Sequence, residues 1–129
     1  MTCEAEFLPA IEIETNSTPK YAIIWLHGLG ADGHDFVPII DQLEIFGVSV
    51  RFIFPHAPVR AVTINNGYQM RAWYDITRLD FADREGIQGI RQARLAIDNL
   101  ITREMSRGIT ANHIFLAGFS QGGAMALYA

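Results

Sequence analysis

Apolar residues along the chain form short runs that alternate with longer segments in which they recur every three or four positions. The short runs are rich in β-branched and aromatic residues, and an unbroken apolar run such as YAIIWL is typical of a strand buried on both faces of a parallel sheet. Such runs predict strands at Tyr21–Leu26, Val48–Phe54 and Ile114–Ala117. A further short strand is predicted at Ala10–Glu14, where Ile11 and Ile13 alternate with polar neighbours.

The segments with helical spacing predict helices between these strands. One helix is expected from about Asp35 to Phe46, with Pro38 in the first turn, where its missing N–H costs little. A longer helix is expected over roughly Arg84–Arg107, with Asp80 or Asp83 as its N-cap. The last six residues, AMALYA, form a helix-prone tail.

Residues 55–75 are predicted to be a long connection on the surface, with a functional role because long connections are uncommon in a domain this small. Strands that alternate with helices give an α/β fold with a mostly parallel sheet. The length of 129 residues fits a single domain, 1–129.

Composition and charge exclude several classes of protein. Half of the residues are apolar and 19% are charged, which is ordinary for a globular domain. The net charge of −4 and the scattered Lys and Arg argue against binding to nucleic acid or to an anionic membrane. Cys3 is the only cysteine, so the chain forms no internal disulfide and no thiolate metal cluster, and we expect no metal or other cofactor. The acidic N-terminal segment lacks the features of a signal peptide, and we expect a cytoplasmic protein.

The first of two glycine motifs is G-x-G-x-x-G at Gly28, Gly30 and Gly33, directly after a predicted strand. This pattern raises the possibility of a dinucleotide-binding domain. Two features disfavour that interpretation. The following helix is expected to begin after the third glycine, and the next strand ends in Phe-Pro-His, where such a domain would offer Asp or Glu to the ribose.

The second motif, G-x-S-x-G, spans Gly118, Ser120 and Gly122 between a predicted strand and the helical tail. This context is typical of a serine nucleophile held on a sharp turn, where the glycines allow the turn to tighten. The backbone N–H of Gln121 would then point toward the developing oxyanion, and the loop that begins at His27 could supply a second N–H. We expect His27 to organise that loop by hydrogen bonding.

Three blocks of sequence, in this order, resemble the carboxylesterase and acyl-protein thioesterase family of α/β-hydrolases. The blocks are WLHGLGADGHDF, FPHAPVRAVTINNGYQMRAWYD and LAGFSQGGAMAL. The resemblance covers almost all of the chain from about Tyr21 onward. It implies a three-layer α/β-hydrolase sandwich and hydrolysis of carboxylic esters or acyl thioesters by a Ser, Asp and His triad, without a cofactor.

The same resemblance implies roles for individual residues. Ser120 corresponds to the nucleophile, and the backbone N–H groups of Leu29 and Gln121 correspond to the oxyanion hole. Trp73 corresponds to a position near the substrate cleft, where it would shape the acyl side. Asp75 is expected to be a structural hydrogen-bonding residue.

The chain departs from the family in one respect. In this fold the triad acid and histidine follow the nucleophile, but the nine residues after Ser120 include no Asp, Glu or His. We expect the sequence to be the N-terminal part of a hydrolase, truncated just after its nucleophile, and the isolated chain to be nearly inactive. His27 or His56 could act as a substitute base, since both follow strands at the same edge of the sheet as Ser120.

Two further expectations follow from this departure. The chain could be a catalytically silent binding module that keeps the cleft without turnover. The strand at Ile114–Ala117 would have an unpaired apolar edge, through which a homo-oligomer could form.

Overall fold

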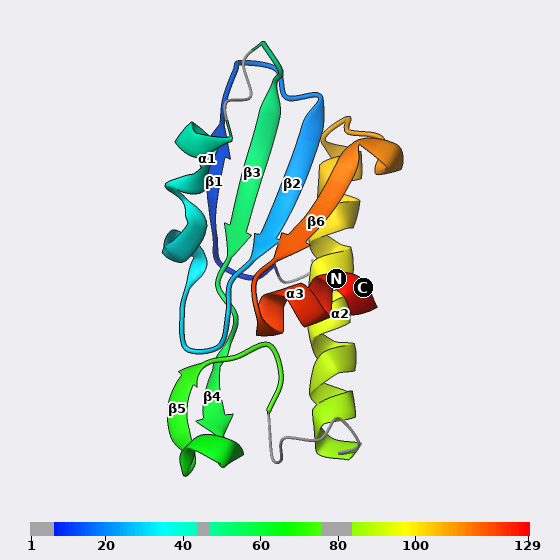
Figure 1. Cartoon of the computed structure of the whole chain (residues 1–129). Coiled ribbons are helices and arrows are strands. Elements are labelled where there is room, and N and C mark those ends of the chain that lie inside the picture. The colour runs from blue at the N-terminus through cyan, green and yellow to red at the C-terminus, as the bar shows by residue number, and fades with distance from the viewer. Residues whose placement is uncertain (1–6, 44–46, 76–83) are drawn as a thin grey trace.

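The computed structural model describes residues 7–43, 47–75 and 84–129, and its centre is a four-stranded sheet (Figure 1). The strand order is β1-β3-β2-β6, where β3 and β6 both pair in parallel with β2, and β1 pairs antiparallel with β3. The strands are β1 (Ala10–Glu14), β2 (Tyr21–Leu26), β3 (Val50–Pro55) and β6 (Ile114–Gly118). All four predicted strands are therefore confirmed, with β3 starting and ending slightly later than expected.

Helices cover both faces of this sheet and complete the predicted three layers (Figure 1). On one face, Ile24, Leu26 and Ile53 pack with residues of α2 (Arg84–Ser106) and α3 (Gln121–Tyr128). On the other face, Phe52 and Phe54 pack against the segment that follows β2. The long helix and the helical tail are thus confirmed, whereas Asp80 and Asp83, proposed as caps, lie outside the described residues.

The helix predicted from Asp35 to Phe46 is wrong in its form. The structure has a 3₁₀ turn, η1 (Gly33–Phe36), followed by a single α-helical turn, α1 (Ile39–Gln42), and residues 44–46 lie outside the described residues. The Asp32 side chain accepts a hydrogen bond from His34 N–H and so starts the first turn before Asp35. Pro38 follows that turn as the N-cap of α1. Because proline has no N–H, it cannot donate the hydrogen bond that would continue one helix from η1 into α1.

Residues 55–75 are also more ordered than expected. They contain a two-stranded antiparallel hairpin, β4 (Val59–Val62) and β5 (Tyr68–Arg71), joined through the 3₁₀ turn η2 (Thr63–Asn65). The hairpin lies at the edge of the molecule where β2 and β3 end (Figure 1). The segment that leaves it, residues 72–74, is buried. The prediction of a surface connection therefore holds for most of residues 58–71 and fails for residues 72–74.

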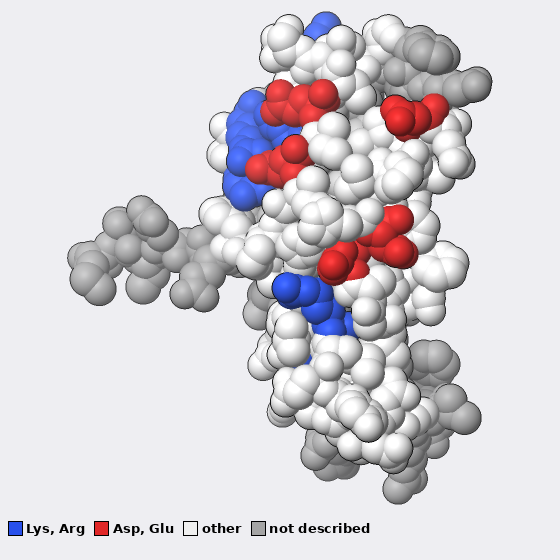
Figure 2. Space-filling model, turned by 90° about the vertical axis from the view of Figure 1, so that its left-hand side faces the viewer, with Lys and Arg blue, Asp and Glu red and all other residues white. Residues whose placement is uncertain are grey.

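Ion pairs attach the C-terminal end of α2 to the sheet. The Glu104 carboxylate is fully buried and lies 2.6 Å from the Arg51 guanidinium of β3 and 3.0 Å from that of Arg107. Arg51 also pairs with Glu14 of β1 at 3.0 Å. Figure 2 shows basic and acidic side chains lying side by side on one part of the molecular surface. No helix among the described residues is long and apolar enough to cross a membrane.

Candidate active site

Ser120 occupies the turn between β6 and α3 with a backbone conformation that serine rarely adopts. Its φ is 55° and its ψ is −118°, outside the regions that L-residues favour. Such strain persists only where the surroundings enforce it, and it is common at functional sites. The side chain is exposed, and its hydroxyl makes no capping bond to α3, although Ser120 is the N-cap.

The surroundings that enforce this turn are two close backbone approaches. A Cβ added to Gly118 would lie 2.3 Å from the Gly122 carbonyl oxygen, and a Cβ added to Gly122 would lie 2.2 Å from the Leu26 carbonyl oxygen. Both contacts are with backbone and leave no room for a side chain. The two glycines of the motif thus allow α3 to pack directly against the ends of β6 and β2. We call residues 118–122 the serine turn.

The loop after β2, residues 27–33, which we call the glycine loop, lies against the serine turn. A Cβ built on Gly28 would be 3.6 Å from Ser120 Cβ. Two backbone hydrogen bonds fix the loop. Gly30 N–H donates to Arg71 O of β5 at 2.9 Å, and Ala31 N–H donates to Gly28 O within the loop at 3.2 Å. The backbone N–H groups of Leu29 and Gln121 have no acceptor among the described residues. One of these donors directly follows Ser120 in the chain, and the other directly follows Gly28, which lies beside Ser120.

His27 is buried, and both of its ring nitrogens are occupied. Nε2 accepts a hydrogen bond from Ala57 N–H at 3.0 Å, so the ring proton is on Nδ1, which lies 2.7 Å from the Gly28 carbonyl oxygen and donates to it. Burial lowers the pKa of His27 and favours this neutral form. His27 therefore holds the glycine loop, as expected, and is not available as a general base in this arrangement.

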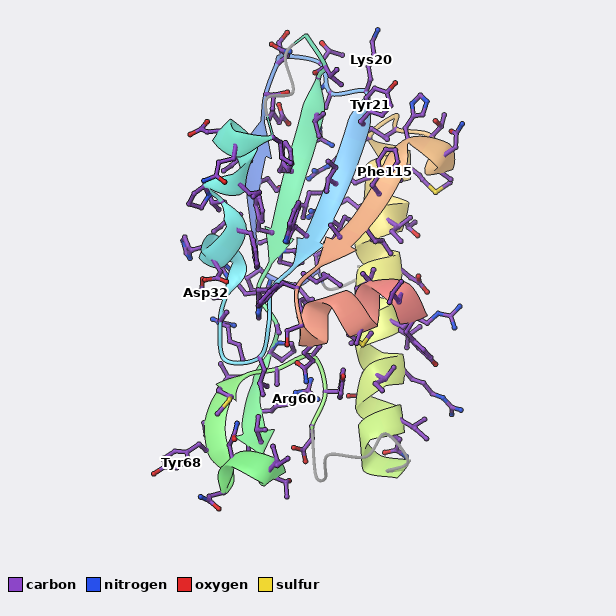
Figure 3. All side chains as sticks on the ribbon, viewed as in Figure 1. Lys20, Tyr21, Asp32, Arg60, Tyr68 and Phe115 are labelled. Carbon is purple, nitrogen blue, oxygen red and sulfur yellow. The ribbon has the colours of Figure 1, made fainter. Side chains whose placement is uncertain are left out.

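Neither His56 nor His113 forms a hydrogen bond with Ser120 among the described residues. His56 follows β3, and its Nδ1 accepts a hydrogen bond from Gly33 N–H at 2.9 Å. His113 packs on Tyr21 with ring centroids 4.5 Å apart, close to the Lys20 carbonyl oxygen. Figure 3 labels Lys20 and Tyr21 at the end of the sheet opposite to Asp32 of the glycine loop.

Two residues near the site have structural contacts that connect segments far apart in the sequence. Trp73 is fully buried, and its indole N–H donates to His27 O at 2.8 Å, so its side chain binds the first residue of the glycine loop. Asp75 accepts hydrogen bonds from the backbone N–H and the hydroxyl of Thr63, at 2.8 and 2.7 Å. The structural role expected for Asp75 is confirmed.

The dinucleotide interpretation is not supported by this geometry. No regular helix begins at Gly33, which starts a 3₁₀ turn of four residues. A Cβ on Gly33 would lie 2.3 Å from the Phe54 carbonyl oxygen. The third glycine therefore allows the loop to pack on the end of β3. A dinucleotide-binding domain would instead begin a regular helix at this glycine and hold the pyrophosphate at the N-terminus of that helix.

One group of potential metal ligands lies beside the site, formed by Asp32, His34 and His56, whose ligating atoms lie within 4.8 Å of one another. Asp32 Oδ1 already accepts a hydrogen bond from His34 N–H at 2.8 Å and lies 3.2 Å from His34 Nδ1. His56 Nδ1 is occupied by Gly33 N–H. Asp32 and His34 thus pair with each other and His56 pairs with Gly33, so the cluster fits a hydrogen-bonded loop.

Comparison with known proteins gives a consistent result. Residues 9–129 match the model of a family described as phospholipase/carboxylesterase. The chain is 37% identical over 123 residues to acyl-protein thioesterase 1 of Cryptococcus neoformans and 36% identical over 119 residues to acyl-protein thioesterase 1 homolog 1 of Dictyostelium discoideum. These matches cover 93% and 91% of this chain but 52% and 51% of the relatives. The chain thus spans about half the length of the curated relatives it matches.

Solved structures show the same fold. SOBER1 of Arabidopsis thaliana superimposes with a TM-score of 0.77 and 32% identity, over 84% of this chain and 53% of that one. Acyl-protein thioesterase 2 of Zea mays gives a TM-score of 0.75 and 29% identity, over 95% of this chain and 50% of that one.

Proposed function

The chain belongs to the phospholipase/carboxylesterase family, and on that basis we propose that Ser120 is the nucleophile of a serine hydrolase that cleaves carboxylic esters or acyl thioesters. The observation that carries the proposal is the strained, exposed Ser120 on a turn that Gly118 and Gly122 hold against the sheet. Such a turn projects a hydroxyl that no neighbouring side chain shields.

The proposed reaction has two steps. In the first, Ser120 Oγ attacks the carbonyl carbon while its proton passes to a base, and the carbonyl oxygen becomes an oxyanion. The backbone N–H groups of Leu29 and Gln121 donate to that oxyanion, since neither has an acceptor among the described residues. The base then gives its proton to the leaving oxygen or sulfur, and the tetrahedral intermediate expels the alcohol or thiol and leaves an acyl-enzyme. In the second step water hydrolyses the acyl-enzyme to the carboxylic acid and free Ser120.

Among the described residues, no histidine or carboxylate forms a hydrogen bond with the Ser120 hydroxyl. His27 uses both ring nitrogens within the glycine loop, and the nine residues after Ser120 contain no Asp, Glu or His. We propose that the described part of this chain supplies the nucleophile and the oxyanion hole. The chain alone is expected to react slowly with electrophiles and to turn over esters poorly.

A covalent probe tests the assignment of the nucleophile. An alkyl fluorophosphonate should label the chain once, at Ser120, as read by intact mass and peptide mapping. Ser120→Ala should abolish the labelling, and Ser106→Ala, which removes an exposed hydroxyl at the end of α2, should leave it unchanged. Labelling that persists in Ser120→Ala would refute the proposal. Efficient hydrolysis of a nitrophenyl ester by the chain, lost in Ser120→Ala, would place the base within these residues.

A further inference from the structure

The side chain of Gln121 is buried next to the exposed serine and pairs with a distant segment at two points. Its Oε1 accepts a hydrogen bond from Trp73 N–H at 2.8 Å, and its Nε2 donates to Tyr74 O at 3.0 Å. A carboxamide is required for this pattern, because one end must accept and the other must donate. The contact ties the start of α3 to the segment that leaves the β4–β5 hairpin.

Trp73 continues this connection to the glycine loop. Its indole N–H donates to His27 O, and its ring lies over the His27 ring with centroids 5.1 Å apart. The His27 ring in turn holds the Gly28 carbonyl. All of these groups are buried, so water does not compete for their hydrogen bonds.

We infer that Gln121 and Trp73 act through their side chains as positioning residues for the oxyanion hole; the inference rests on the proposed function. The hydrogen bonds run from Gln121, whose backbone N–H is one proposed donor, through Trp73 and His27 to Gly28, which directly precedes the other proposed donor, Leu29. The two donors belong to loops that come from different strands. This buried network fixes the distance between them.

The test separates the speed of the covalent step from binding of the probe. When a fluorophosphonate reacts, Ser120 Oγ forms a bond to phosphorus, fluoride leaves, the hydroxyl proton passes to solvent, and the phosphoryl oxygen gains charge in the hole. Gln121→Met keeps the length of the side chain but removes both hydrogen bonds. We expect its limiting rate of labelling to fall by about tenfold or more while the half-saturating probe concentration stays within about twofold, because a displaced donor weakens the transition state more than the ground state.

A second variant and a matched control distinguish a specific loss of rate from a loss caused by misfolding. Trp73→Phe keeps an aromatic ring in the core but removes the indole N–H together with part of the ring system, and we expect a loss of roughly three- to tenfold in the same limiting rate. Gln92→Met makes the same chemical change at an exposed position of α2 and should leave both parameters unchanged. Near-ultraviolet circular dichroism checks the folding of each variant.

The possible outcomes test the positioning role of Gln121 and Trp73 separately from the nucleophilic role of Ser120. If Ser120 is labelled and both Gln121→Met and Trp73→Phe retain the wild-type limiting rate, the positioning role is refuted while the proposed nucleophile stands. If the variants raise only the half-saturating concentration, the network shapes probe binding and the inference is also refuted. If the wild-type chain is not labelled at Ser120, the proposed function fails and this inference fails with it.

Discussion

Gly122 lies so close to the end of β2 that a single added methyl group has no space. In Gly122→Ala the new Cβ would be 2.2 Å from Leu26 O and 2.4 Å from His27 O, and neither backbone atom can rotate away. We expect a loss of unfolding free energy of about 2 kcal/mol or more, measured by urea denaturation. At the neighbouring Gly123 the nearest atom to an added Cβ is 3.2 Å away, and alanine favours the helix. Gly123→Ala should therefore change stability by less than about 1 kcal/mol, and equal losses in the two variants would contradict the packing argument.

The neutral state of His27 predicts a dependence of stability on pH. Burial lowers the pKa of His27 in the folded protein, while the unfolded chain has the ordinary value near 6.5. The contribution of this group is therefore complete above that value and is lost as the pH falls below it, because the unfolded state then binds the extra proton. His56, whose pKa is also lowered by burial, acts in the same direction, and Asp32 and Arg71 are the charged neighbours of His27.

Substitution isolates the part due to His27. The unfolding free energy of the wild-type chain should fall between pH 7 and pH 5, by up to about 1.4 kcal/mol per pH unit for one group. His27→Gln should show a smaller slope in the same denaturation series, whereas His113→Gln, at the far end of the sheet, should keep the slope of the wild type. A His27→Gln variant with an unchanged slope would show that His27 does not hold its neutral form in the folded state.

At the scale of elements, α2 depends on a buried charge for its attachment to the sheet. The Glu104 carboxylate is fully buried, and Arg51 is its partner on β3. Arg51→Met leaves that charge with Arg107 alone, and removal of one partner of a buried pair costs about 3–5 kcal/mol. We expect a loss toward the lower end of that range in urea denaturation. Asp98→Asn, which breaks a pair exposed on the surface of α2, should cost less than about 1 kcal/mol, and a similar loss in both variants would refute the anchoring role.

The elements differ in how far the sequence predicts them, for physical reasons. The central strand β2 was predictable because its residues form an apolar run without interruption, and the edge strand β1 because Ile11 and Ile13 alternate with polar residues. The helix expected from Asp35 was wrong because the Asp32 side chain caps an earlier turn, which a periodic pattern does not record. The local sequence signal for the hairpin is the pair Asn66-Gly67, which is typical of a hairpin turn and has positive φ values of 58° and 76°.

At the scale of the whole molecule, the site forms because β2, β3 and β6 are parallel and end at the same edge of the sheet. This rule is sufficient to predict that the glycine loop and the serine turn lie close together. The two motifs then identify Ser120 as the candidate nucleophile and the amides of Leu29 and Gln121 as candidate oxyanion-hole donors. The network of Gln121, Trp73 and His27 could not be predicted in the same way, because its side-chain hydrogen bonds join residues that are distant in sequence and depend on the hairpin that positions Trp73.

The outer edge of β6 gives a prediction for the 129-residue chain in solution. Among the described strands β6 pairs only with β2, so its other edge presents unpaired backbone groups beside Phe115, which is 51% exposed. Such an edge is a template for pairing with a second chain. We expect light scattering to show a dimer or larger assembly at micromolar concentration, and Phe115→Lys to shift it toward monomer, because a charge at an edge strand opposes pairing. Leu95→Lys, at a 64% exposed position on α2, should not shift the assembly. A monomeric wild-type chain, or an equal response to both substitutions, would exclude association through this edge.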